Sequence, residues 1–229
     1  MIQFPSPARS ESGRGLVPFI TQRAGEESAP ANLLILWEKR GPGLRLFYGD
    51  EDARDRPLRG VLWARCSFSH DKQGMPVGEP QWKMMHPYRQ TGTMLAGRCQ
   101  ICTRPARTPL GYVYLAGPRD EDPRQEPILT NQPPVCARHV RTAAALCPHM
   151  EGEPTVFLTS SAPMHGVMGT VYGMARGEVV PVAAPNETVR FDDPRMPMML
   201  ASQLVRRLTR FRVLTVAELL DELGPTGTS

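Results

Sequence analysis

Apolar residues fall into short runs separated by turn residues along much of the chain, and this pattern predicts strands. Two such runs, 33–37 and 44–48, flank a Gly-Pro-Gly turn and predict a β-hairpin. Alternation over 60–69 predicts a third strand, and 111–116 predicts a fourth. The region 155–185 holds three further β-rich stretches with glycines at the expected turns.

Four other stretches have the spacing of helices. Residues 87–97 begin with a proline and end on a glycine, which suit the first turn and the C-cap of a helix. A second helix is expected over 136–146, before a proline that ends it. Apolar residues over 197–211 recur at helical spacing, and 215–224 opens with a Thr-x-x-Glu capping box. We therefore expect two helices at the C-terminal end.

Composition places the chain among globular proteins with many turns. Its 229 residues are 41% hydrophobic and 22% charged, and they include 24 prolines and 20 glycines. No apolar run approaches the length needed to cross a bilayer, and the first residues lack the pattern of a secretion signal. We expect a cytoplasmic protein without a membrane partner, in which clustered cysteines stay reduced and serve metal or redox chemistry.

The most specific motif is a pair of short cysteine and histidine spacings. Cys99 and Cys102 form a C-x2-C pair, and Cys136 and His139 form a C-x2-H pair after a hairpin-length insert. Two chelating pairs brought together by such an insert supply the four ligands of a tetrahedral Zn²⁺ site. A Cys3His set leaves no position for water or substrate, so we expect the zinc to be structural.

The order of these elements resembles the treble-clef zinc finger. A cysteine turn, a strand-containing segment and a helix carrying the last two ligands in its first turn follow each other over about 97–150. The resemblance implies a zinc-held module of the kind that often binds DNA or RNA. The chain is also similar to CxxC/CxxH proteins of high-GC actinobacteria, in which arginine largely replaces lysine; that group implies no particular activity.

Four other residues could form a second metal site. Cys66 with His70 and Cys147 with His149 also have chelating spacings. Cys147 lies about 16 Å beyond Cys136 if the helix is regular, so it is not expected to join the first site. The alternatives are that these side chains bind no metal, or that the Cys-Pro-His segment folds back and competes with His139.

The enzyme classes that use such motifs fit poorly. A His-Asn-His nuclease needs further histidines on the hairpin strand and the helix, where only His139 is present. Zinc deaminases need an upstream His-x-Glu or Cys-x-Glu, and neither precedes Cys136 in the sequence. A redox C-x2-C pair would leave Cys136 and His139 unexplained. An enzyme with an unidentified pocket, a nuclease or a specialised-metabolism catalyst, remains the alternative to a binding protein.

The charge pattern indicates a binding role. The net charge is +4, and arginine is the residue that binds phosphate through a planar fork. We expect contacts with nucleic acid or a partner protein, and the candidate phosphate-contacting residues are Arg98, Arg104, Arg107, Arg138, Arg141, Arg206, Arg207, Arg210 and Arg212. A plain amphipathic helix would explain the last four equally well.

Together these observations predict an α+β fold. Its expected parts are a flexible arm (1–14), a β-rich N-terminal lobe (15–96), a treble-clef-like zinc module (97–150), and a β-hairpin region with two C-terminal helices (151–229).

Overall fold

The computed structural model describes residues 16–29, 32–38, 41, 43–117, 127–146, 154–183 and 186–224. The N-terminal half has β1 (Thr21–Arg23), β2 (Leu33–Glu38), β3 (Gly43–Tyr48), the 3-10 turn η1 (Ala53–Asp55), β4 (Leu62–Trp63), β5 (Pro80–Met85), α1 (Pro87–Leu95) and β6 (Tyr112–Ala116). The rest has β7 (Ile128–Thr130), η2 (Ala137–His139), α2 (Val140–Leu146), β8 (Thr155–Ser161), β9 (Met164–Ala175), β10 (Glu178–Pro181), β11 (Glu187–Arg190), η3 (Met196–Met198), β12 (Met199–Leu214) and α3 (Val216–Leu223).

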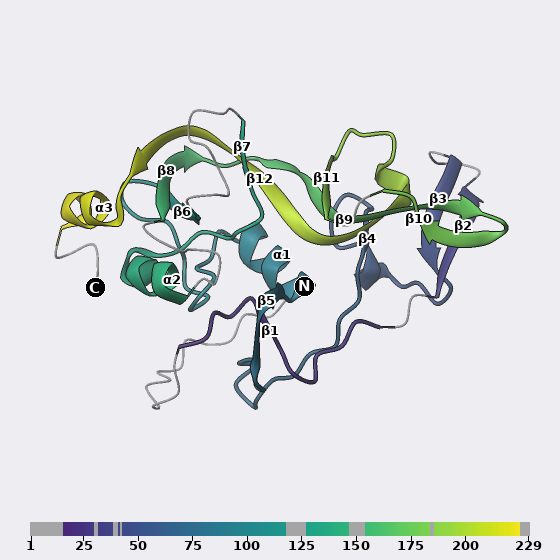
Figure 1. The fold of residues 1–229 in the computed structure, drawn as a ribbon, viewed down its shortest axis with the longest axis horizontal. Helices are drawn as coiled ribbons and strands as arrows, with labels where there is room; N and C mark the ends of the chain where they lie inside the picture. Colours follow the sequence, from purple (N-terminus) through teal and green to yellow (C-terminus); the bar gives the residue numbers. More distant parts are fainter. Residues whose placement is uncertain are drawn as a thin grey trace.

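Strand β12 organises the molecule. Within the described residues, eight strands share one sheet, with the order β10-β9-β12-β8-β6; β11 also pairs with β9, and β4 and β7 also pair with β12. Strand β12 runs along much of the long axis in Figure 1, between the β10 region and α3, antiparallel to β9 in its first half and to β8 in its second. Strands from distant parts of the sequence are therefore joined through one 16-residue element.

This strand corrects the sequence prediction for 197–211, where a helix was expected. The prediction was wrong because helical spacing of apolar residues says nothing about available strand partners. Nearly the whole of β12 forms backbone pairs with β9, β8, β7 or β4, and these tertiary contacts outweigh the local helix propensity. Of the two expected C-terminal helices, only α3 forms. It has the expected capping box, in which the Thr215 hydroxyl accepts from the Glu218 N–H.

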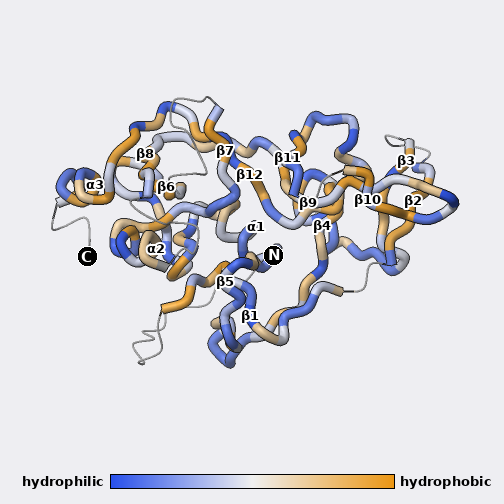
Figure 2. The backbone as a smooth tube through the Cα atoms, in the orientation of Figure 1, coloured by the Kyte–Doolittle hydropathy of each residue, from blue (hydrophilic) through white to orange (hydrophobic). Residues whose placement is uncertain are grey.

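Close packing between strands requires glycine, which has no Cβ, at some positions. A Cβ on Gly169 of β9 would lie 2.0 Å from the carbonyl oxygen of Leu200 on β12. Glycine at this position lets the two backbones approach each other. The largest apolar core lies around the same strands, and hydrophobic positions gather where β9, β4 and β12 meet (Figure 2).

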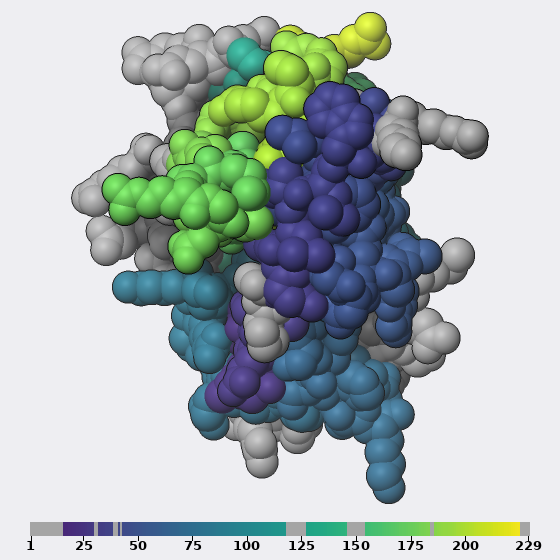
Figure 3. Space-filling model, turned by 90° about the vertical axis from the view of Figure 1, so that its right-hand side faces the viewer, coloured from purple at the N-terminus to yellow at the C-terminus, as the bar shows by residue number. Residues whose placement is uncertain are grey.

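Strands β2 and β3 form the predicted hairpin as a separate two-stranded sheet. Leu46 and Tyr48 of β3 are buried with Leu62, and Val179 of β10 packs against them. In Figure 3 the purple residues of the hairpin lie beside the green residues of β9 and β10. The strand expected over 60–69 is much shorter, since only Leu62 and Trp63 pair with β12 as β4.

The other predicted elements are mostly confirmed. Helix α1, strand β6 and strands β8 to β10 occur where the pattern placed them. The helix expected over 136–146 begins as the 3-10 turn η2 and continues as α2. The structure is therefore mixed but dominated by strands. The four-part division stays a prediction; its first part, 1–14, lies outside the described residues, and strands from the other three parts meet in the sheet of β12.

Candidate metal centre

The first ligand pair lies in a tight turn directly after α1. Gly97 has a positive φ of 59°, and the chain then turns back so that the Cys99 N–H donates to the carbonyl of Arg104 at 2.8 Å. The Thr103 N–H donates to the carbonyl of Cys99 at 2.9 Å, which closes the loop around Cys102. The C-x2-C spacing therefore folds locally into a turn that presents both sulfurs on its inner side.

The second pair lies at the start of a helix. Val135 pairs with Val113 of β6, which fixes the chain just before Cys136. Cys136 is the N-cap of η2, and its carbonyl accepts from the His139 N–H at 2.9 Å. Because one 3-10 turn separates them, Cys136 and His139 present their side chains on the same side.

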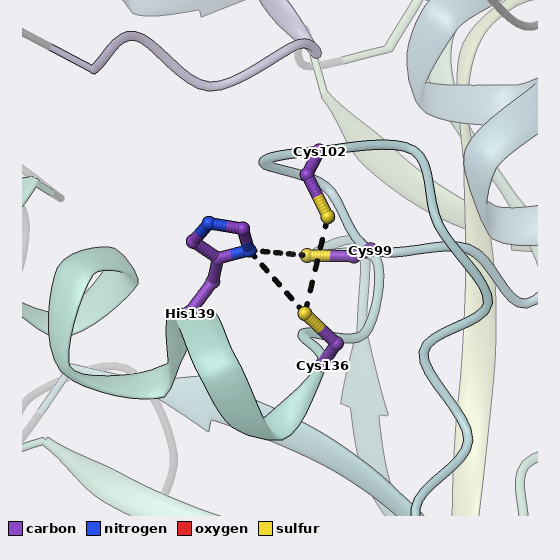
Figure 4. Close-up of side chains that lie close together, drawn as sticks. All are labelled: Cys99, Cys102, Cys136 and His139. Carbon is purple, nitrogen blue, oxygen red and sulfur yellow. Dashed lines mark hydrogen bonds between the residues drawn. The ribbon is translucent and has the colours of Figure 1, made fainter. Parts of the chain in front are cut away.

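The fold brings the two pairs together. The potential ligand atoms of Cys99, Cys102, Cys136 and His139 all lie within 4.8 Å of one another, and the four side chains point toward a common centre (Figure 4). The sulfurs of Cys102 and Cys136 are 3.9 Å apart, and the His139 Nδ1 lies 3.3 Å from the Cys136 sulfur. The Gln100 N–H also donates to the Pro134 carbonyl at 3.0 Å, a backbone link between the pairs that the sequence did not predict.

The four side chains are held against an apolar core. Cys99 is fully buried, whereas Cys102, Cys136 and His139 are half-buried. The core beneath them includes Val113 and Leu115 of β6, and Leu219 and Leu223 of α3. The cluster therefore joins the turn after α1 and the start of η2 to one end of the sheet.

The pKa values of the clustered side chains show why a cation is needed for all of them to be deprotonated together. A hydrogen bond from Cys136 lowers the pKa of the Cys102 thiol, while the same bond raises the pKa of Cys136. Hydrogen bonding to Cys102 and then to Cys99 raises the pKa of His139 to about 9. Four such groups cannot all lose their protons beside one another without a cation. A divalent metal supplies that charge, because its ligands are thiolates and neutral imidazole.

The donor set fits a tetrahedral metal such as Zn²⁺, which takes sulfur and nitrogen ligands. Among the described residues, this is the grouping of histidine, cysteine and acidic side chains that could hold a metal ion. The second predicted site stays a prediction, because only two of its four residues lie in the part that the structure describes. Cys66 is buried, His70 is exposed and hydrogen-bonds Asp71, and Cys147 and His149 lie outside the described residues.

The predicted phosphate-contacting arginines divide into two groups. Arg104, Arg107, Arg138 and Arg141, close in sequence to the ligands, are exposed, and Arg98 is half-buried with one donor bonded to the Thr103 carbonyl. On β12, Arg206 is used inside the fold, where it donates to the carbonyls of Met94 and Ala162. Arg212 pairs with Glu222, and Arg207 and Arg210 are exposed. The β12 arginines therefore do not form one helical basic face.

In comparisons with known proteins, no family model, curated protein or solved structure matches the chain. Among the described residues, none of the helices has both the length and the apolar character that crossing a bilayer requires.

Proposed function

We propose that Cys99, Cys102, Cys136 and His139 bind one structural Zn²⁺, and that the chain is a zinc-stabilised binding protein. The observation that supports the zinc most directly is the convergence of four ligand atoms within 4.8 Å from two segments far apart in the sequence. A cysteine turn, a strand-containing segment and a helical segment that starts with the last two ligands are also the parts of a treble-clef finger, and this order supports that relationship as part of the proposal.

A structural role follows from the composition and position of the site. Four protein ligands complete a tetrahedral shell, so no position remains for a substrate or an activated water. The ligands also connect the turn after α1, the start of η2 and the core under α3. Binding energy from the metal then becomes folding energy for this end of the molecule.

Metal analysis of the purified, zinc-loaded protein tests this proposal. We expect about one Zn²⁺ per chain in the wild type, and a large loss of bound zinc and thermal stability in Cys136→Ser. Cys66→Ser is the matched control, because Cys66 is a buried cysteine that lies outside the cluster. A wild type that binds no zinc, or a Cys136→Ser variant that binds it as tightly, contradicts the proposal.

For the partner we propose nucleic acid, bound through the phosphate backbone. The supporting observation is that Arg104 and Arg138 each follow a metal ligand by two residues, are exposed, and form no ion pair among the described residues. Arg107 stacks on the Tyr112 ring, with 5.3 Å between the guanidinium carbon and the ring centroid, which leaves the edge of the guanidinium available. Arginines held by a rigid module can contact phosphates at low entropic cost.

The test is binding to mixed-sequence DNA and RNA at about 50 mM salt, where phosphate contacts are strongest. We expect binding that weakens steeply with added salt, and a loss of roughly ten-fold or more in Arg104→Ala/Arg138→Ala. Arg54→Ala is the control, since Arg54 is highly exposed but belongs to η1, away from the cluster in sequence. Absence of binding at this salt concentration would favour a protein partner or the enzyme alternative.

A further inference from the structure

The three ligand sulfurs differ in their exposure to solvent. Cys99 is fully buried within the apolar core, while Cys102 and Cys136 are half-buried. Cys102 lies in a turn in which Thr103 is buried and Arg104 and Pro105 are exposed, and Cys136 lies between the buried residues Val135 and Ala137 at the start of η2. Two of the three ligand cysteines are therefore partly open to solvent, and their sulfurs are direct neighbours.

We propose that the metal centre is also a redox switch, in which a hydroperoxide joins Cys102 to Cys136 as a disulfide and thereby releases the metal. The inference rests on the proposed function, because it describes the regulation of the same zinc site.

The geometry selects this pair of cysteines. The two sulfurs are 3.9 Å apart, and disulfide formation requires them to approach to about 2.05 Å. The movement is roughly 2 Å. Cys102 and Cys136 are both partly exposed, although Ile101 and Thr103 on either side of Cys102 are buried. Cys99 is less suited, since its sulfur is enclosed by core residues such as Ile101 and Val140.

The chemistry balances with hydrogen peroxide as the only co-reactant. The Cys102 thiolate attacks one peroxide oxygen, the O–O bond breaks, and hydroxide leaves, so Cys102 becomes a sulfenic acid. The Cys136 thiolate then attacks that sulfur, the S–S bond forms, and a second hydroxide leaves. The two sulfurs together lose two electrons, the peroxide gains two, and two protons from solvent convert the hydroxides to water.

The switch would release the metal without separating the turn after α1 from the start of η2. After oxidation only Cys99 and His139 remain as ligands, which is too few for a stable zinc site. The disulfide replaces the metal as the link between the turn after α1 and the start of η2. The segment that carries Arg138 is then held at Cys136 but released at His139, so the proposed phosphate-binding surface loses its fixed arrangement. A dithiol reductant restores both thiolates and the site.

The test uses a Cys66→Ser/Cys147→Ser protein, in which the three ligand cysteines are the only cysteines left. The zinc-loaded protein is treated with hydrogen peroxide; released zinc is measured with a colorimetric chelator, free thiols are counted, and the disulfide is located by peptide mass mapping. We expect the loss of two thiols and one Zn²⁺ per chain, a bond between Cys102 and Cys136, and recovery after dithiothreitol.

A second variant separates metal binding from disulfide formation. Cys136→His keeps a zinc ligand but removes one sulfur of the pair, so zinc release by peroxide should become about ten-fold slower or more. Release at the wild-type rate, a disulfide through Cys99, or oxidation to sulfinic acid alone overturns the inference. If the purified protein binds zinc but peroxide does not release it, only the switch fails. If the purified protein does not bind zinc at all, the proposed function fails.

Discussion

The side-chain amide of Gln90 pairs with the backbone of Leu204 as a neighbouring strand would. Its Nε2 donates to the Leu204 carbonyl at 2.9 Å, and its Oε1 accepts from the Leu204 N–H at 2.9 Å. The same Nε2 donates to the carbonyl of Asn131 at 2.6 Å. Gln90 is fully buried, so one side chain of α1 satisfies three backbone groups that water cannot reach. This contact fixes α1, which leads into the metal-binding turn, on the middle of β12.

Removing this amide should destabilise the protein strongly. Gln90→Ala leaves buried backbone groups without partners, and we expect the free energy of unfolding to fall by about 3 kcal/mol. Urea denaturation measures the change. Gln73→Ala is the control, because Gln73 is exposed and should change stability by less than about 0.5 kcal/mol. Equal effects of the two substitutions would show that the Gln90 contact contributes little.

A buried ion pair offers a second test. Glu26 and Arg89 have almost no exposed surface, and two hydrogen bonds of 2.5 and 2.6 Å join them. In Glu26→Gln the buried guanidinium loses its counter-charge, so we expect a loss of about 3 kcal/mol in the free energy of unfolding. The exposed pair of Arg190 with Asp192 is the control, and Asp192→Asn should leave stability unchanged within error.

The same pair predicts a pH dependence. Burial raises the pKa of Glu26, but hydrogen bonds from Arg89, Arg23 and Ser69 outweigh it and hold the pKa below the ordinary value of 4.5. The folded state therefore binds the proton less readily than the unfolded state does. The stabilising contribution of the ionised Glu26 side chain is complete above the pKa of this group in the unfolded state, and it is lost as the pH falls through its pKa in the folded state. The stability difference between wild type and Glu26→Gln should shrink in acid, and a difference that grows instead would contradict this assignment.

One substitution in the turn between β9 and β10 should raise the stability of the protein. Arg176 and Gly177 both have positive φ, 52° and 83°, and they connect Ala175 to its partner Glu178 as a two-residue hairpin turn. Asparagine tolerates this conformation better than arginine does. Arg176→Asn should raise stability by about 0.5 kcal/mol, whereas Gly177→Ala should lower it by about 1 kcal/mol. Thermal melting of the two variants checks both directions, and a lower melting temperature for Arg176→Asn would rule out the turn assignment.

Zinc affinity should rise with pH. The metal binds neutral imidazole, but hydrogen bonding to Cys102 and Cys99 raises the pKa of His139 to about 9 in the metal-free cluster. A proton therefore competes with the metal at neutral pH, and the competition ends only as the pH approaches 9. Competition with a chelator of known affinity between pH 6 and 9 measures this effect. An affinity that does not change over that range would show that His139 is not a ligand.

The sequence predicted which four residues could form a metal-binding cluster, because chelation by short spacings is a local property. With only two residues between Cys99 and Cys102, and between Cys136 and His139, a single turn is enough to bring both side chains of each pair to one side. The capping box of α3 and the hairpin of β2 and β3 were predictable for the same reason, since their signals lie within a few residues. The helix expected over 197–211 failed because its apolar spacing suited a helix locally, while its strand partners lie elsewhere in the sequence.

The sequence by itself determined which residues could bind a metal and where several local elements lie, such as the β2–β3 hairpin, α1 and α3. Only the tertiary structure decided that the two pairs meet, that β12 is a strand, and that Arg206 bonds inside the fold while Arg104 and Arg138 face solvent. Spacing constrains atoms that are a few bonds apart. The pairing of β12 with β8 and β9, and the burial of Gln90 against Leu204, depend on backbone groups that meet only when the whole sheet has formed.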